Sequence, residues 1–368
     1  MRILYRYYIS PSEKNVTDRV QQLLNQIKDM ENIISLSFFG YSSDSEYYQD
    51  EQLIKDEVIK IFRSSLPLVT YIIQPLADKQ QLAVEVMTTD ASCDRLEYEG
   101  IHYAYFQDEK EKFLLTEGLV FENDYFDENS NCLVAFSKMQ HLLQKHSMQL
   151  NDIVRQWNYI GNITQEYQGR QIYQLFNDSR TRFYQQGNWE KGYPSATGIG
   201  MDCSKTIISL LCYTGACYPI DNPLQQPAHR YSSQVLLGKE ADEKSTPKFE
   251  RAKAIKAGID YLCFISGTAA IRGEASMLDQ HADSQVIQTL ENISHLISAD
   301  NLKRSGLRET CSQLQNLRIY IKKKEHYPLI ENQIKQLYPH VPTLFVLADI
   351  CRDELLVEIE GTATIYPS

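Results

Sequence analysis

The chain of 368 residues lacks several features that mark well-defined classes of protein. No hydrophobic run reaches the length of a transmembrane helix, and the N-terminal segment MRILYRYYIS has no apolar core of the kind that a signal peptide needs. The phosphate-binding motifs GxGxxG and GK[ST] are both absent. We therefore expect a cytoplasmic protein with no membrane partner.

Paired cysteines and an excess of positive charge are missing as well. The eight cysteines are scattered, without a CxxC pair or a Cys/His spacing typical of a metal site, so we expect reduced, buried thiols and no metal. The 48 acidic residues outnumber the 37 lysines and arginines, which gives a net charge of −11. This balance argues against nucleic acid as a partner. An anionic small molecule remains compatible with it, provided that arginines gather locally around the ligand.

The chain contains enough apolar sequence for two domains. Hydrophobic residues make up 43% of it, and 368 residues are ample for two cores. Residues 1–130 are rich in short strand-like runs, with helical spacing at 16–28 and 50–64. This first part carries no motif on which a chemical function could be based.

From residue 132 onward, one order of predicted elements occurs twice. Helix, strand, helix, proline-containing turn and two strands follow one another over residues 132–213, and the same order returns over residues 284–361. We therefore expect two related α+β domains, an N-terminal one at 1–218 with a divergent, strand-rich first part, and a C-terminal one at 251–368. The segment 219–250, rich in Pro, Gln, Lys and Asp, is predicted to be the linker between them.

The last strand-forming segment carries the first candidate for a working acid. Two apolar runs between residues 343 and 361 flank the polar turn 352–354, which predicts a hairpin. Alternation along the strand puts Glu358 and Glu360 on one face. A carboxylate between apolar neighbours is costly unless it is paired or used, so Glu358 is our candidate general acid. The alternative is that both glutamates lie on the solvated face of an antiparallel strand.

An arginine on a packed helix face is the second candidate. Arg180 follows Phe176 by four residues and Tyr173 by seven, so it shares the apolar side of the helix predicted at 172–186. A buried arginine needs an anionic partner, which is either a ligand carboxylate or an acidic side chain of the protein itself.

Two further segments could contact a ligand. Residues 221–231 are dense in hydrogen-bonding side chains and are held extended by prolines, although such a composition is also typical of a plain linker. In the small-residue run at 265–273, Gly267 would let a ligand approach the backbone closely. Cys351 lies in an apolar run, where it could equally be simple core filling.

Six segments in matching order, from about residue 150 to the end, resemble the chorismatase family, which is built on the YjgF/RidA (endoribonuclease L-PSP-like) fold. They are Trp157-Asn158-Tyr159-Ile160, Phe176-Asn177 with Arg180, the run 193–200 (YPSATGIG), the segment 222–231, Ser266-Gly267-Thr268-Ala269, and the run 348–360 that contains Cys351 and Glu358.

The resemblance implies two RidA-like domains, each a mixed sheet with helices packed on one face, and an active site in or near the cleft between them. It implies cleavage of the enolpyruvyl ether of chorismate, or of a related cyclic dicarboxylate, to pyruvate and a hydroxybenzoate or a cyclohexadiene diol, without metal or organic cofactor. RidA-fold proteins commonly trimerise, so a homotrimer is one possibility, whereas a two-domain chain could satisfy part of that packing internally.

The resemblance also assigns roles to individual residues. It implies that Glu358 and Cys351 are catalytic and that the substrate is bound by Arg180, Tyr173, Arg230, Tyr231, Gly267 and Thr268. The position of Gly267 is linked in the family to the product formed, and glycine there resembles the 3-hydroxybenzoate branch.

The chain departs from the family pattern at three places. Ile172 and Leu224 stand where the family often has arginine, and Glu274 stands where it has histidine. Two other functions on the same fold therefore remain open, a RidA-type enamine or imine deaminase and a non-catalytic small-molecule binding protein. The deaminase is disfavoured because it resembles an activity that needs an arginine near Thr343, where this chain has none.

Overall fold

Three large mixed sheets, two small two-stranded sheets and the helices packed on them make up the described part of the protein. The computed structural model describes residues 2–10, 15–63, 65–79, 81–124, 130–232, 245–277, 281–307 and 310–367. Residues 233–244 of the predicted linker lie outside these ranges. Within them, no helix is long and apolar enough to cross a membrane.

The first unit, residues 2–90, forms a four-stranded sheet in the order β1-β4-β2-β3 with two helices. Its first helix begins at Asn15, whose side chain accepts a hydrogen bond from the Asp18 amide and satisfies one of the free donors of the first turn. The elements are β1 (Ile3–Ile9), α1 (Val16–Ile27), β2 (Ile33–Gly40), α2 (Tyr47–Phe62), β3 (Leu68–Ile73) and β4 (Ala83–Thr89).

The second unit, residues 94–213, forms a sheet in the order β12-β9-β13-β7-β6-β5, with β8 also paired to β13. Strand β9 is buried along its whole length because the helices cover one face and the other two sheets cover the second face. The elements are β5 (Asp94–Tyr98), β6 (Ile101–Gln107), β7 (Lys112–Thr116), β8 (Leu119–Glu122), α3 (Asn131–Lys145), η1 (Leu150–Asp152), β9 (Ile153–Gly161), β10 (Glu166–Tyr167), β11 (Arg170–Gln171), α4 (Ile172–Tyr184), β12 (Ser195–Met201) and β13 (Lys205–Tyr213).

The third unit, residues 217–367, forms a sheet in the order β14-β15-β16-β21-β19-β20. Its core packs the apolar faces of α5 and α7 against the central strands. The elements are β14 (Cys217–Ile220), η2 (Ala228–Arg230), β15 (Ala252–Ala257), β16 (Asp260–Ala269), β17 (Ile271–Arg272), β18 (Ala275–Ser276), α5 (Ala282–Leu296), α6 (Ala299–Arg304), β19 (Thr310–Ile321), η4 (Lys324–His326), α7 (Tyr327–Leu337), β20 (Thr343–Leu347) and β21 (Val357–Pro367).

The expected α+β class, with mixed sheets and helices packed against them, is confirmed, and the repeat goes further than the sequence predicted. All three units contain the order strand, helix, strand, helix, strand, strand, which begins at β1, at β7 and at β16 when the short elements β8, β10, β11, β17, β18 and α6 are left out. In each case the last strand of this order lies between its first and its second strand. In each unit the second and third strands pair in parallel. The first unit therefore repeats a topology that its sequence did not reveal.

The predicted hairpin at 343–361 is wrong. Strand β20 pairs in parallel with β19, and β21 pairs antiparallel with the other edge of β19, so β19 lies between the two strands. The apolar runs on either side of the turn could not reveal this arrangement, because the separating strand comes from earlier in the chain. The segment between β20 and β21 is consequently free to reach across to the second unit.

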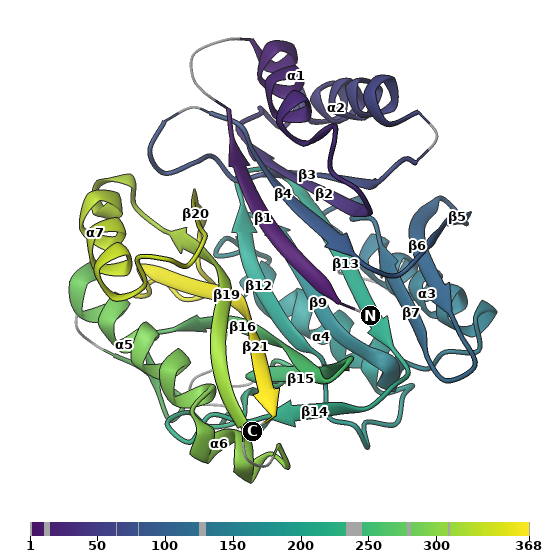
Figure 1. Cartoon of the computed structure of the whole chain (residues 1–368). Coiled ribbons are helices and arrows are strands. Elements are labelled where there is room, and N and C mark those ends of the chain that lie inside the picture. Colours follow the sequence, from purple (N-terminus) through teal and green to yellow (C-terminus); the bar gives the residue numbers. More distant parts are fainter. Residues whose placement is uncertain are drawn as a thin grey trace.

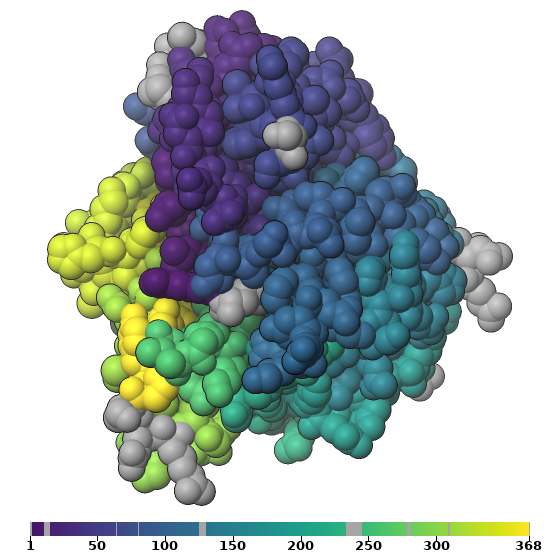
Figure 2. All heavy atoms as spheres, turned by 45° about the vertical axis from the view of Figure 1, so that its right-hand side comes forward, coloured from purple at the N-terminus to yellow at the C-terminus, as the bar shows by residue number. Residues whose placement is uncertain are grey.

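The three units share one core. Figure 1 shows α1 and α2 along the top, α5, α6 and α7 along the left and lower edge and α3 on the right, with the strands between them. In Figure 2 the purple first unit lies against both the blue-to-teal second unit and the yellow-green third unit. A single hydrophobic cluster joins buried side chains from all three sheets, among them Phe38, Tyr159 and Phe264.

Charged side chains from the three sheets also meet in this shared core. Arg318 on β19 binds Glu85 on β4 (Nη2–Oε2, 2.6 Å) and Glu360 on β21 (Nη1–Oε1, 2.9 Å). Glu360 is bound in addition by Arg155 on β9 (Nη2–Oε2, 2.7 Å). These four residues, called the central charge chain below, alternate in sign and are all buried.

A second ion pair, with a buried lysine and exposed acidic partners, connects the first unit to the second. Lys205 on β13 binds Asp44 at 2.7 Å and Glu122 at 3.4 Å, and its side chain is only 5% exposed. We predict that Lys205→Met lowers the free energy of unfolding by about 0.5–1.5 kcal/mol, because charge-assisted hydrogen bonds between a buried ammonium and two half-exposed carboxylates are lost. Urea unfolding measures this change.

The matched control is Lys335→Met, which removes a pair with Glu331 whose lysine is 63% exposed. It should change stability by less than about 0.5 kcal/mol. Equal effects of the two substitutions would contradict the assignment of Lys205 as a fastening residue.

Candidate active site

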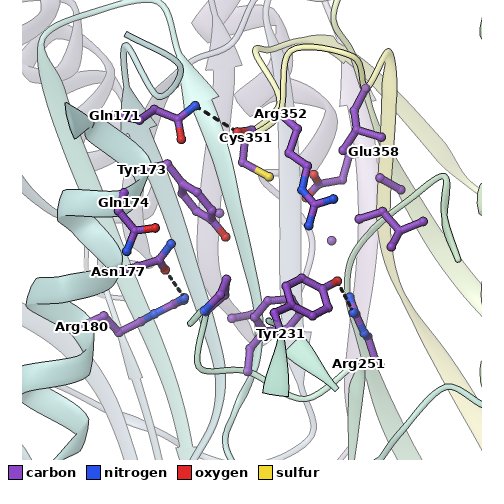
Figure 3. Close-up of a pocket in the computed structure, with 18 residues that line it drawn as sticks. Gln171, Tyr173, Gln174, Asn177, Arg180, Tyr231, Arg251, Cys351, Arg352 and Glu358 are labelled. Carbon is purple, nitrogen blue, oxygen red and sulfur yellow. Dashed lines mark hydrogen bonds between the residues drawn. The ribbon is translucent and has the colours of Figure 1, made fainter. Parts of the chain in front are cut away.

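The main pocket lies between the second and third units. Its space, together with the part open to solvent at its mouth, is about 780 Å³. Figure 3 shows the side chains of α4 on one side of this space and Glu358 and Arg251 on the other, with Cys351 and Arg352 between them. Its lining residues are Gln171, Tyr173, Gln174, Asn177, Arg180, Ala196, Gly198, Tyr231, Pro247, Phe249, Arg251, Gly267, Ala269, Ile271, Cys351, Arg352, Leu355 and Glu358.

Helix α4 supplies one wall because of its period. Tyr173, Asn177 and Arg180 are separated by four and three residues, so they project from one face of the helix into the pocket. Asn177 Oδ1 accepts a hydrogen bond from Arg180 Nη2 at 2.6 Å, which fixes the direction of the guanidinium.

The floor of the pocket is the seam between β12 and β16. Ser266 Oγ accepts a hydrogen bond from the Ala196 amide at 2.9 Å, and Thr197 Oγ1 accepts one from the Gly267 amide at 3.0 Å. Beside them, the Gly200 amide donates to the Asp349 carbonyl at 2.8 Å. The first two bonds hold β16 against β12, and the third holds the segment that carries Cys351 and Arg352 against the second unit.

Glu358 is the acid of the pocket. It is 6% exposed, and its carboxyl group has no hydrogen bond or salt bridge to any other residue that the structure describes. Burial and the negative charge of Glu360 raise its pKa to about 8, against the opposing effect of Arg155 and Arg251. At neutral pH the side chain is therefore mainly a protonated acid that faces the cavity.

Gly267 makes room for this acid. A methyl group at its Cα would overlap Glu358 Oε1, and would lie 3.0 Å from Glu358 Cδ and 3.1 Å from Thr197 Cγ2. Any larger residue at this position must displace the carboxyl group or the strand that carries it.

Three arginines surround the cavity without an acidic partner. Across the residues that the structure describes, no salt bridge joins Arg180, Arg251 or Arg352 to a carboxylate. Arg180 and Arg251 are only 1% and 3% exposed. Buried, unpaired guanidinium groups facing a cavity make a site for an anion, and the ion pair within the protein that was the alternative for Arg180 is absent from the described residues.

Tyr231 holds two of these arginines in place. Arg251 donates to its hydroxyl group at 2.5 Å and to the Gln226 carbonyl at 2.7 Å. The guanidinium groups of Arg251 and Arg352 each lie 5.5 Å from the centre of the Tyr231 ring, within the range of cation–π attraction. Arg352 also donates to Ser276 Oγ at 2.9 Å.

Two neutral hydrogen-bonding groups complete the site. Burial, followed by the charge of Glu358, raises the pKa of the Cys351 thiol to about 12, so the sulfur remains protonated at neutral pH. Burial likewise raises the pKa of Tyr173 above its ordinary value. Gln171 Nε2 donates to the Cys351 carbonyl at 3.2 Å and so ties α4 to this segment.

Six of the eight predicted site residues line this pocket, and two do not. The six are Glu358, Cys351, Arg180, Tyr173, Tyr231 and Gly267. Thr268 is buried on the opposite face of β16, where its hydroxyl donates to the Ser266 carbonyl, because neighbouring strand residues point to opposite sides. Arg230 ends the short helix η2 with an exposed side chain. These two residues therefore do not line the pocket, and a role in substrate binding stays a prediction for both.

The three departures from the expected pattern also lie outside the pocket lining. Ile172 packs against the core of the second unit, and the Leu224 carbonyl accepts a hydrogen bond from the Gly273 amide. The Glu274 carboxylate accepts bonds from the amide and hydroxyl of Ser232, both at 2.6 Å. Arg251 and Arg352 supply positive charge in the pocket in addition to Arg180.

Sequence reasoning missed Arg251 as a pocket residue. The run KFERAK at 248–253 has the composition of a solvated strand end, yet Arg251 and Lys253 are both buried. Their spacing of two residues was the available signal, since it puts both on one face of a strand. Within the described ranges no group of three His, Cys, Asp or Glu side chains could hold a metal ion.

Comparison with known proteins identifies relatives along most of the chain. Residues 85–212 match the family described as "Chorismatase FkbO/Hyg5-like, N-terminal". A 3-hydroxybenzoate synthase from Streptomyces hygroscopicus is 30% identical over 287 residues, which cover 75% of this chain and 80% of that protein. A chorismatase from Streptomyces rapamycinicus is 30% identical over 221 residues, 57% of this chain and 63% of that protein.

A solved structure shares the fold. The crystal structure of a chorismatase superposes with a TM-score of 0.71 over 98% of each chain, at 20% sequence identity. The superposition spans nearly the whole chain and therefore includes the first unit.

The raised pKa of Glu358 leads to a prediction about stability. Between its ordinary value and about 8, the carboxyl is protonated in the folded protein and ionised in the unfolded one, so its contribution to stability falls as the pH rises through this window. Relative to the wild type, Glu358→Gln should gain up to about 1.4 kcal/mol per pH unit between pH 5 and 8.

Urea unfolding of both proteins at several pH values measures the difference, in which all other titrating groups cancel. A difference that stays constant from pH 5 to pH 8 would contradict a protonated Glu358.

Proposed function

The chain belongs to the chorismatase family, and from this premise we propose that it cleaves the enolpyruvyl ether of chorismate to pyruvate and 3-hydroxybenzoate. The observation that carries the proposal is a buried, protonated Glu358 facing a cavity with three arginines that have no acidic partner among the described residues. An acid in such a place can donate a proton, and the arginines can bind a substrate with two carboxylates.

Glu358 is proposed to protonate the methylene carbon of the enolpyruvyl group. The methylene then becomes a methyl group, and positive charge develops on the carbon that bears the ether oxygen. The ionised Glu358 stabilises this charge. The bond between the ether oxygen and the ring carbon then breaks, so that the ether oxygen leaves as the keto oxygen of pyruvate. The neighbouring ring hydroxyl oxygen closes onto that ring carbon and loses its proton, which returns to the Glu358 carboxylate, and isomerisation of the resulting ring gives 3-hydroxybenzoate without water. A carboxyl with a pKa of about 8 holds its proton at neutral pH until the substrate accepts it.

The arginines are proposed to set the orientation of the substrate. Arg180 lies on the α4 side of the cavity, whereas Arg251 lies on the other side with Glu358 (Figure 3). A dicarboxylate that spans the cavity would place one carboxylate at each side and its ether between them. Tyr231 and Asn177 hold the guanidinium groups for this purpose.

The product branch is proposed from Gly267 and Cys351. Gly267 has the residue type that resembles the 3-hydroxybenzoate branch, and the 30% identical relative is a 3-hydroxybenzoate synthase. The protonated thiol of Cys351 lines the same cavity as Glu358 and could exchange a proton with the ring of the substrate. Overall this branch consumes no water, whereas the diol branch consumes one.

A first prediction concerns the proton donor. Purified protein should release pyruvate from chorismate in a coupled assay, and Glu358→Gln should lower kcat by at least about 100-fold, because an amide cannot supply the proton. The binding of chorismate, measured by calorimetry, should change far less.

Glu57→Gln is the matched control, since Glu57 is a buried carboxylate on α2 bound to Gln21 and Lys60, away from the pocket. It should keep wild-type turnover. Chorismate binding without pyruvate from the folded wild type would favour a binding protein. Ammonia from an enamine substrate would favour a deaminase.

A second prediction concerns Gly267. In Gly267→Ala the new methyl group must displace the Glu358 carboxyl, so we expect slower pyruvate release and a shift of products from 3-hydroxybenzoate towards the cyclohexadiene diol. Chromatography of the reaction mixture measures the ratio.

Gly198→Ala provides the comparison within the same pocket. Its methyl group would press on the Tyr173 ring, 3.0 Å away, and leave Glu358 in place. It should therefore raise KM without altering the product ratio. An unchanged product ratio in both variants would reject the role of Gly267 in product choice.

A further inference from the structure

We propose that the first unit takes part in the reaction: Glu85, through Arg318, holds Glu360 in place as a fixed anion behind Glu358, and this anion keeps the catalytic acid protonated. Glu85, Arg318 and Glu360 are positioning residues in this account. The inference rests on the proposed role of Glu358 as proton donor, and it assigns a function to a unit that contributes no side chain to the pocket lining.

The central charge chain leads directly from the first unit to the strand of the acid. Glu85 on β4 binds Arg318 on β19, and Arg318 binds Glu360 on β21, at 2.6 and 2.9 Å. Glu360 and Glu358 are two residues apart on β21, so their side chains leave the same face of the strand. The fixed charge therefore lies one strand repeat from the proton that is to be donated.

The central charge chain also contacts the floor of the pocket through a hydrogen-bonded hydroxyl group. Thr197 Oγ1 donates to Glu360 Oε2 and accepts from Arg155 Nη2 (2.6 Å) and from the Gly267 amide (3.0 Å). Gly267 is the residue against which the Glu358 carboxyl packs. Glu360 is thus linked, through one hydroxyl group, to the backbone that sets the position of the acid.

The groups around Glu358 favour its neutral form, whereas the groups around Glu360 favour its ionised form. Glu358 faces Glu360 on its own strand, Arg155 from β9, Arg251 from the start of β15, Tyr173 from α4 and Cys351 from the preceding loop. Glu360 faces Arg318 and Tyr320 from β19 and Arg155 from β9, and Glu85 stands behind Arg318. Burial favours the neutral form of both acids, but Arg318 and Arg155 hold the pKa of Glu360 below its ordinary value.

A purely structural role does not account for this arrangement well. Buried ion networks are often no more stabilising than apolar side chains of the same volume, so stability alone gives little reason for four buried charges. Two adjacent carboxyls with opposite protonation states are, in contrast, a recurring feature of acid catalysis.

The test compares Glu360→Gln and Glu85→Gln with Glu57→Gln as control. Loss of the fixed anion removes the repulsion that keeps Glu358 protonated, so the alkaline limb of kcat/KM should move at least one unit towards lower pH in Glu360→Gln. Glu85→Gln should move it in the same direction by a smaller amount, because Arg318 then acts on Glu360 alone. Glu57→Gln should not move it.

A second readout does not require turnover. The infrared band of the protonated Glu358 carboxyl, identified by its loss in Glu358→Gln, should disappear at lower pH in Glu360→Gln and Glu85→Gln than in the wild type. If the wild type releases no pyruvate from chorismate, the proposed function is overturned, but the infrared titration can still be carried out. Folded Glu360→Gln and Glu85→Gln proteins that titrate like Glu57→Gln would overturn the inference, and Glu85→Gln serves alone if Glu360→Gln does not fold.

Discussion

The structure depends on the different surroundings of two neighbouring carboxyl groups on one strand, of which one is ion-paired and the other is not. Glu360 has two arginines, and Glu358 has no bonding partner within the described residues. Both are buried, so the energetic cost of an unpaired charge is avoided in two different ways, by pairing at Glu360 and by protonation at Glu358. An ion pair and a proton donor thus arise two residues apart, which is the chemical asymmetry that the proposed reaction needs.

The fold explains how such a site can be built from one chain. Three sheets of the same topology pack around a shared core, and each contributes at least one member of the central charge chain. The pocket itself uses two of these units, because β12 and β16 meet at its floor and α4 closes it. The 30% identical relative gives the family and the solved chorismatase structure gives the fold, while the proposed substrate rests on the acid and on three arginines without a carboxylate partner among the described residues.

Much of the site could be predicted from sequence because its signals are local. The period of α4 placed Tyr173 and Arg180 on one face, and the cost of a carboxylate between apolar neighbours pointed to Glu358. The failures are non-local: the insertion of β19 between β20 and β21, the repeat in the first unit, and the arrival of Arg251 from a run that looks solvated. Thr268 lies outside the pocket lining, as alternation along β16 would have indicated once Gly267 was chosen. The predicted domain boundaries and the homotrimer stay predictions.

The most direct test of the account is the source of the hydrogen that becomes part of the pyruvate methyl group. Chorismate would be turned over in deuterium oxide, with lactate dehydrogenase present to trap pyruvate as lactate before its methyl group exchanges with solvent. Because the proton of Glu358 equilibrates with water before each turnover, the account predicts one deuterium in the methyl group of the lactate, seen by mass spectrometry. A methyl group without deuterium would mean that the hydrogen comes from the substrate itself, which would contradict a proton-donating Glu358.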